Sequence, residues 1–211
     1  MITEIFPSLF WIHLAERVPG TPYTYLLRRD TGNILFNTKA DLTAFEPELA
    51  SLGGVQHILL GDRHHAAPHS VAFSRRMRAP LTASTIEAKA LQSKGVEVGK
   101  VMPHERTKFS PDLEIIPTPG HTRGAFSYLW TNRKKRYLFI GDTLVPESGQ
   151  WQIYVTRPNR EMMLHTVNEL AKLEFDVILS NSFVALPTAW FEVTARSRKK
   201  IFDEVREKLT D

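Results

Sequence analysis

Four polar loops follow short apolar segments in this chain, and three of them contain aspartate or histidine side chains. The loops span residues 61–65, 119–122, 141–143 and 180–182. Ligand sites in open α/β sheets gather at the carboxyl ends of strands, so loops that end strands of one direction are expected to meet at one edge. Histidine and carboxylate groups suit zinc, iron or manganese. The first three loops therefore predict a metal site.

Apolar patterns and turn signals predict the elements that position these loops. Segments 23–28 and 33–37 flank a glycine-containing turn and predict a β-hairpin, and segments 125–130 and 136–140 predict a second one. Helices are expected over residues 42–52, 84–93, 159–173 and 187–209, with Ser84 or Thr85, Asn159 and Pro187 at or near the starts of the last three. Each half of the chain begins with strands and then alternates strand and helix, which predicts a layered α/β or α+β architecture.

Three sequence motifs resemble those of the metallo-β-lactamase superfamily. VQHILL at 55–60 looks like the strand before its His-x-His-x-Asp-His signature. PTPGHTRG at 117–124 is similar to its Pro-Gly-His-Thr-x-Gly loop, and LFIGDT at 138–143 resembles the strand and Gly-Asp that supply its bridging aspartate. The resemblance covers most of the chain. It implies a single domain over residues 1–211, with an α/β (α+β) fold arranged as a four-layer αββα sandwich.

The signature itself departs from the family pattern. Laid on the loop after residue 60, it places Asp62 at the first histidine and His64 at the second. Ala66 falls at the aspartate and Ala67 at the third histidine, and neither side chain has a donor atom. The family's last histidine would fall near residue 182, where the chain has Asn181 and Ser182.

The resemblance implies which ligands survive. The first metal site of the family keeps His64, His121 and Asp142, with Asp62 in place of a histidine, whereas the second keeps only Asp142. A carboxylate can replace an imidazole on these metals. One zinc, or iron or manganese, is therefore the expected cofactor, and the same four residues are the expected catalytic group. The alternative is that they form a hydrogen-bonded polar cluster without metal.

Three functions remain open from the sequence. The first is a hydrolase with one metal, acting on an ester, thioester, lactone or phosphoester. The second is a non-catalytic relative that binds or scaffolds, since a fold can persist without its chemistry. The third is a mononuclear iron oxygenase. His65 or His69 would be a ligand only if the loop is re-registered, and segment 150–154 is a candidate pocket wall.

Composition and charge limit the kinds of site and partner that this chain can have. The 211 residues include no cysteine, which excludes disulfides, cysteine zinc sites and cysteine nucleophiles. The net charge is +4, and its basic clusters accompany no nucleic-acid-binding motif. Residues 1–10 do not resemble a signal peptide, and no apolar run is long enough to span a membrane. We expect a cytoplasmic protein with a small-molecule substrate or ligand and no nucleic-acid or membrane partner; a homodimer is left open.

Overall fold

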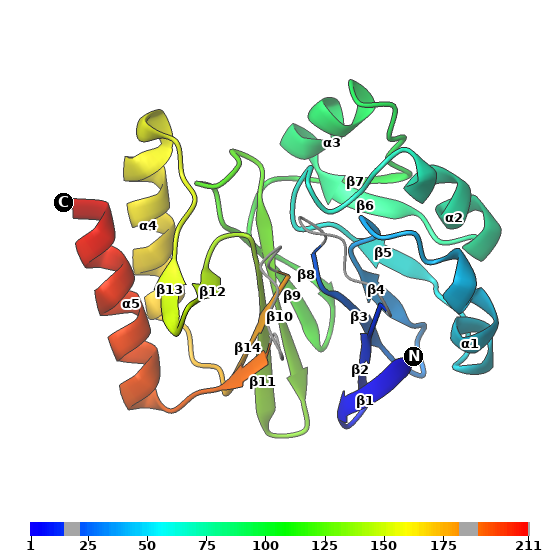
Figure 1. Cartoon of the computed structure of the whole chain (residues 1–211), viewed down its shortest axis with the longest axis horizontal. Helices are drawn as coiled ribbons and strands as arrows, with labels where there is room; N and C mark the ends of the chain where they lie inside the picture. The colour runs from blue at the N-terminus through cyan, green and yellow to red at the C-terminus, as the bar shows by residue number, and fades with distance from the viewer. Residues whose placement is uncertain (15–21, 182–189, 211) are drawn as a thin grey trace. The chain divides into compact units, whose positions relative to one another are not determined.

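The computed structural model describes residues 1–14, 22–181 and 190–210, and the chain divides into two compact units. The first unit is Met1–Pro103 and the second is His104–Asp211. Each unit contains one large β-sheet with helices on one face (Figure 1). The two halves predicted from the sequence are confirmed.

The first unit is built on a seven-stranded mixed sheet. Its strands lie in sequence order as β1 (Ile2–Phe6), β2 (Leu9–Ile12), β3 (Thr24–Leu27), β4 (Ile34–Phe36), β5 (His57–Leu59), β6 (Leu81–Ser84) and β7 (Lys100–Met102). The first three pairings are antiparallel and include the predicted hairpin of β3 and β4. The last three pairings are parallel, so β5 and β6 both end at the same edge of the sheet.

Helices cross over between the parallel strands of this unit, as parallel pairing requires. They are the 3₁₀ turn η1 (Thr43–Phe45), α1 (Glu46–Ser51), α2 (His69–Met77) and α3 (Thr85–Gln92). Their apolar faces pack on the sheet in one core, which includes Leu35 and Ile58 from strands and Leu49, Phe73 and Leu91 from helices. The predicted helix 42–52 is therefore split into η1 and α1, with a proline in the first turn of α1.

The second unit is built on a six-stranded sheet. Its strands are β8 (Thr107–Ser110), β9 (Leu113–Pro117), β10 (Phe126–Asn132), β11 (Lys135–Gly141), β14 (Val177–Ser180) and β15 (Trp190–Glu192), in the spatial order β15-β14-β11-β10-β9-β8. Only β11 and β14 pair in parallel among these strands. The predicted hairpin of β10 and β11 is confirmed, and a separate two-stranded hairpin joins β12 (Val145–Glu147) to β13 (Gln150–Gln152).

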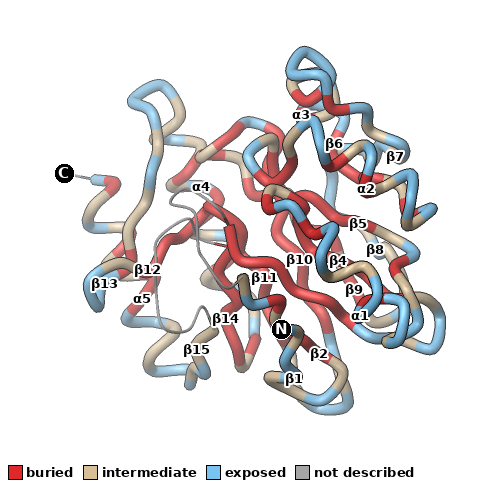
Figure 2. The backbone as a smooth tube through the Cα atoms, turned by 45° about the vertical axis from the view of Figure 1, so that its right-hand side comes forward, coloured by how far each residue is buried: buried red, intermediate tan, exposed pale blue. Residues whose placement is uncertain are grey.

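Two helices cover one face of this second sheet, and their contacts form its core. They are α4 (Arg160–Ala171), preceded by the 3₁₀ turn η2 (Arg157–Asn159), and α5 (Ala195–Thr210). Leu138 and Ile140 of β11 pack with Met163 and Val167 of α4 and Phe202 of α5. Figure 2 shows buried residues concentrated in the central strands, whereas exposed residues lie mainly in loops and along the helices. Trp151 also lies in this core, as expected for a large aromatic residue.

The predicted start of the helix over residues 187–209 is wrong. Residues 187–189 lie outside the described part of the chain. Trp190–Glu192 forms the edge strand β15, and the helix begins at Ala195. The cause is local: the Thr194 hydroxyl accepts the Ser197 N–H at 3.2 Å, and the Thr194 N–H donates to the Ser197 hydroxyl at 2.8 Å. This reciprocal cap fixes the first turn of α5.

None of the helices in the described ranges is both long enough and apolar enough to cross a membrane.

Candidate metal centre

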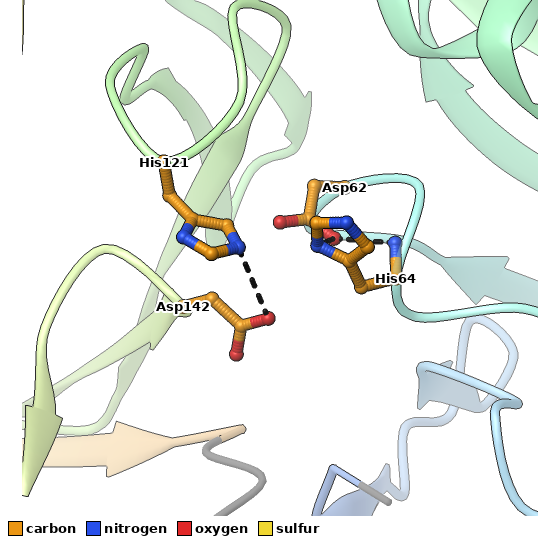
Figure 3. A group of neighbouring side chains, drawn as sticks. All are labelled: Asp62, His64, His121 and Asp142. Atoms are coloured by element: carbon orange, nitrogen blue, oxygen red, sulfur yellow. Dashed lines mark hydrogen bonds and ion pairs between the residues drawn. The ribbon is translucent and has the colours of Figure 1, made fainter. Parts of the chain in front are cut away.

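The loop after β5 carries Asp62 and His64 in the first unit. The Asp62 carboxylate is buried, and its Oδ1 accepts the His64 backbone N–H at 2.7 Å. The same Oδ1 lies 3.5 Å from Nδ1 of the His64 ring, which is 45% exposed (Figure 3). An aspartate that accepts the N–H two residues later forms an Asx turn. The two side chains are therefore neighbours within the loop.

His65 closes this loop from inside the unit. Its ring is buried, and its Nδ1 accepts the Gly61 backbone N–H at 3.0 Å. Its carbonyl accepts the Thr38 N–H at 2.8 Å. Because Nδ1 acts as an acceptor, the ring is neutral and carries its proton on Nε2. The Nδ1 atom is thus committed to the loop backbone, while His69 is simply the exposed first residue of α2.

His121 and Asp142 meet in the second unit. His121 follows β9 and Asp142 follows β11, and both strands run antiparallel to β10, which lies between them. The two loops consequently leave the sheet at one edge, as the sequence predicted. Nε2 of His121 lies 3.9 Å from Oδ2 of the buried Asp142 carboxylate (Figure 3).

The other nitrogen of His121 is used to hold the ring. His121 Nδ1 lies 2.6 Å from the Tyr154 carbonyl oxygen, which can only accept, so Nδ1 carries the proton. In the neutral ring, Nε2 is then the nitrogen that can bind a metal. A histidine that donates one N–H to a carbonyl while its other nitrogen coordinates is the usual arrangement of a metal ligand. The predicted pocket wall at 150–154 thus includes a residue whose backbone orients the candidate ligand.

The Tyr154 side chain is fixed separately. Its hydroxyl donates to Glu147 Oε2 at 2.6 Å, which links the segment after β13 to the last residue of β12. This hydrogen bond, more than burial, raises the pKa of the Tyr154 phenol. The phenol is therefore neutral near pH 7 and can serve as a hydrogen-bond donor.

Helix α4 anchors the loop that carries His121. The Thr166 hydroxyl donates to the Pro119 carbonyl at 2.6 Å, and the Asn159 side-chain amide donates to the Gly120 carbonyl at 3.0 Å. Asn159 occupies the N-cap position of α4 without a side-chain cap bond. The prediction that it caps the helix is therefore correct in position, but its amide is engaged by the loop. Met163 packs so closely on Gly120 that a Cβ there would lie 2.8 Å from its sulfur.

Comparison with known proteins finds similarity at the level of structure alone. No family model matches the chain, and no curated protein matches its sequence. A β-lactamase from Chitinophaga pinensis is 16% identical with a TM-score of 0.72, covering 99% of this chain and 92% of that one. The class B3 di-zinc metallo-β-lactamase LRA-12 from an Alaskan soil metagenome is 17% identical with a TM-score of 0.68, covering 99% and 91%. A B3 metallo-β-lactamase described as having an active-site glutamic acid is 15% identical with a TM-score of 0.67, covering 100% and 91%.

This chain has the metallo-β-lactamase fold. The likeness spans both units, and the fold predicted from the three motifs is confirmed. At this level of identity, the likeness concerns the fold and leaves the chemistry to the residues themselves.

The metallo-β-lactamase fold here carries alanines where the signature's aspartate and third histidine would align. Ala66 is buried in the apolar core of the first unit, and the Ala67 backbone N–H donates to the Ser70 hydroxyl at 2.9 Å. Asn181, beside the expected position of the last histidine, is buried, and Ser182 lies outside the described residues. The Ala66 and Ala67 side chains cannot bind a cation.

Several residues that support the four candidates were not predicted from the sequence. They are Arg63, Glu87, Tyr154 in its backbone role, Met163 and Thr166. Their contacts join segments 24 to 47 residues apart, and no local spacing encodes such pairs. A signal did exist for Gly120, because a glycine before a candidate ligand often marks a close approach of the backbone.

Proposed function

We propose that this chain is a metal-dependent hydrolase holding at most one metal ion, bound jointly by the Asp62–His64 pair and the His121–Asp142 pair. Each of the four side chains offers one ligand atom. Two imidazoles and two carboxylates fit zinc, and they also suit iron or manganese. The resemblance of the loops to those of the metallo-β-lactamase superfamily supports combining the pairs, and the di-zinc neighbour supports zinc as the first metal to test.

The observation that carries this proposal is the orientation of His121. Its Nδ1–H is committed to the Tyr154 carbonyl, and its Nε2 is directed toward a buried carboxylate. An imidazole nitrogen beside a carboxylate oxygen is a ligand pair that zinc, iron and manganese accept.

The chain's own residues would bind the metal ion, balance its charge and position the substrate. When bound, a zinc ion would lower the pKa of a coordinated water to roughly 7 and supply hydroxide at neutral pH. Asp62 and Asp142 would neutralise the ion's charge, and the Asx turn would hold His64 beside Asp62. The neutral Tyr154 phenol would donate a hydrogen bond to substrate if Glu147 released it. The methyl group of Ala66 cannot orient water, so we expect slow turnover.

The test is a panel of esters, thioesters, lactones, phosphodiesters and a β-lactam, assayed with protein purified without chelator. We expect hydrolysis of at least one class, loss of activity on chelation, and recovery with Zn²⁺. His121→Ala should abolish turnover, whereas His165→Ala, on the exposed face of α4, should leave it unchanged. Turnover that persists equally in both variants would contradict the proposal.

A non-catalytic binding or scaffolding protein is the second candidate, and Ala66 and Ala67 favour it. Both lack donor atoms, and Ala66 belongs to the core. A panel with no turnover by metal-loaded protein would support this candidate. A mononuclear iron oxygenase would instead show oxygen consumption by an iron-loaded sample. For each candidate we propose a cytoplasmic protein with a small-molecule partner.

A further inference from the structure

Arg63, which lies between the two candidate ligands of the first unit, makes three hydrogen bonds to a single carboxylate. Its Nε and Nη2 donate to Glu87 Oε2 and Oε1 at 2.7 and 2.8 Å. Its backbone N–H donates to Glu87 Oε2 at 3.0 Å. Both the side chain and the main chain of the loop are therefore attached to Glu87.

The order of the sheet explains how Glu87 reaches the loop. Strands β5 and β6 are parallel neighbours, so the loop after β5 and the start of α3 after β6 lie at one edge. Ser84 caps α3 by accepting the Glu87 N–H at 3.0 Å, which fixes the backbone of Glu87 in the first turn. The carboxylate is thereby held in place before it meets Arg63.

The Arg63–Glu87 contact is largely buried, so the Glu87 carboxylate needs a charged hydrogen-bonding partner. The Glu87 side chain is 1% exposed, and that of Arg63 is 29% exposed. A buried carboxylate is stable only when it is paired and hydrogen-bonded, and a bidentate guanidinium satisfies it with defined geometry. A second pair in the chain offers a contrast: Arg106 also binds Glu114 through two hydrogen bonds, but its side chain is 54% exposed.

We propose that the Arg63–Glu87 pair is a positioning device that fixes the loop so that Asp62 and His64 are presented together as metal ligands. Its metal-related part rests on the proposed function. Arg63 lies inside a turn that the His65 N–H closes on the Asp62 carbonyl at 3.2 Å. Attaching its backbone and side chain to Glu87 therefore restrains the peptide units on both sides, which belong to Asp62 and His64. The Asx turn of Asp62 and the His65–Gly61 bond then complete the shape of the loop.

The test compares Glu87→Gln with Glu114→Gln, which removes one charge from the more exposed pair. The first readout is amide hydrogen exchange of the metal-free protein in a peptide covering residues 61–65. The second is Co²⁺ titration followed by visible absorption, which reports both affinity and coordination geometry. We expect Glu87→Gln to speed exchange in the loop, weaken Co²⁺ binding by about 10- to 100-fold and change the spectrum. Glu114→Gln should change neither readout.

Each other result has a defined meaning. Unchanged hydrogen exchange in Glu87→Gln would overturn the proposal. Faster exchange with unchanged Co²⁺ affinity and spectrum would also overturn it, because the pair would then have only a structural role. If Glu87→Gln fails to fold, Arg63→Lys is used instead. It keeps the positive charge but loses the bidentate hydrogen bonding to Glu87, and the same outcomes apply. A wild-type chain that binds no Co²⁺ overturns the proposed function and the metal-related part together. The exchange readout then still decides whether the pair fixes the loop.

Discussion

Single residues in the second unit determine how accurately His121 is placed. The loop before it passes so close to α4 that Gly120 leaves no room for a methyl group beside Met163. The space beside Met163 therefore restricts the side chain at position 120 to a single hydrogen atom. The sequence shows the glycine and the histidine side by side, but it cannot show the methionine 43 residues later that makes the glycine necessary.

Gly120→Ala is therefore expected to destabilise the protein by about 1–3 kcal/mol, because the new Cβ would overlap Met163. Urea denaturation would measure the change. Gly149→Ala is the matched control, since Gly149 has a positive φ of 78° but no atom within 4 Å of the added Cβ. Equal losses in the two variants would show that backbone conformation, and not the Met163 contact, is responsible.

The phenol of Tyr154 offers a second test at this scale. Its pKa is raised chiefly by the hydrogen bond to the Glu147 carboxylate, which favours the protonated phenol. In Glu147→Gln the pKa should fall toward its ordinary value, so tyrosinate should form at lower pH. Difference absorbance against Tyr154→Phe isolates this group from the other tyrosines. An unchanged or higher pKa would contradict the assigned hydrogen bond.

At the scale of elements, capping and strand order decide where functional loops begin. Ser84 was predicted as a possible cap and does cap α3, because its serine and the glutamate three residues later form a local signal. The start of α5 was misplaced, since the apolar residues of β15 continue the helical pattern and only Thr194 and Ser197 mark the boundary. Helical periodicity alone does not reveal an edge strand.

Thr194→Ala should lower the free energy of unfolding by about 0.5–2 kcal/mol, because α5 would lose its N-cap. Chemical denaturation provides the measurement. Thr210→Ala, at the last turn of the same helix, is the control and should have little effect, because its hydroxyl only donates to carbonyls of the preceding turn. A loss confined to Thr210→Ala would contradict this account of the helix start.

For the whole molecule, the sequence predicted more of the fold than of the site. Three motifs in the right order were enough for the metallo-β-lactamase fold, because strands and their following loops carry local patterns. Of the candidate ligands, His121 and Asp142 lie at one edge of their sheet as expected, and their role as ligands stays a prediction. The supporting contacts were missed, since Arg63 with Glu87 and His121 with Tyr154 depend on which strands become neighbours.

The sequence also predicts one domain over residues 1–211, and cooperativity of unfolding tests this prediction. Trp11→Phe leaves only the tryptophans of the second unit, so its fluorescence reports that unit, while far-ultraviolet circular dichroism reports both. A single domain should give coincident transitions by the two probes. Two separated transitions would show that the units unfold independently.

Metal stoichiometry tests the central claim most directly. Protein purified without chelator and analysed for transition metals should contain about one equivalent per chain, as expected for a preformed site. His121→Ala should contain little, and His165→Ala should match the unmodified protein. Less than about a tenth of an equivalent in the unmodified protein would contradict the account, and so would two equivalents that both depend on His121.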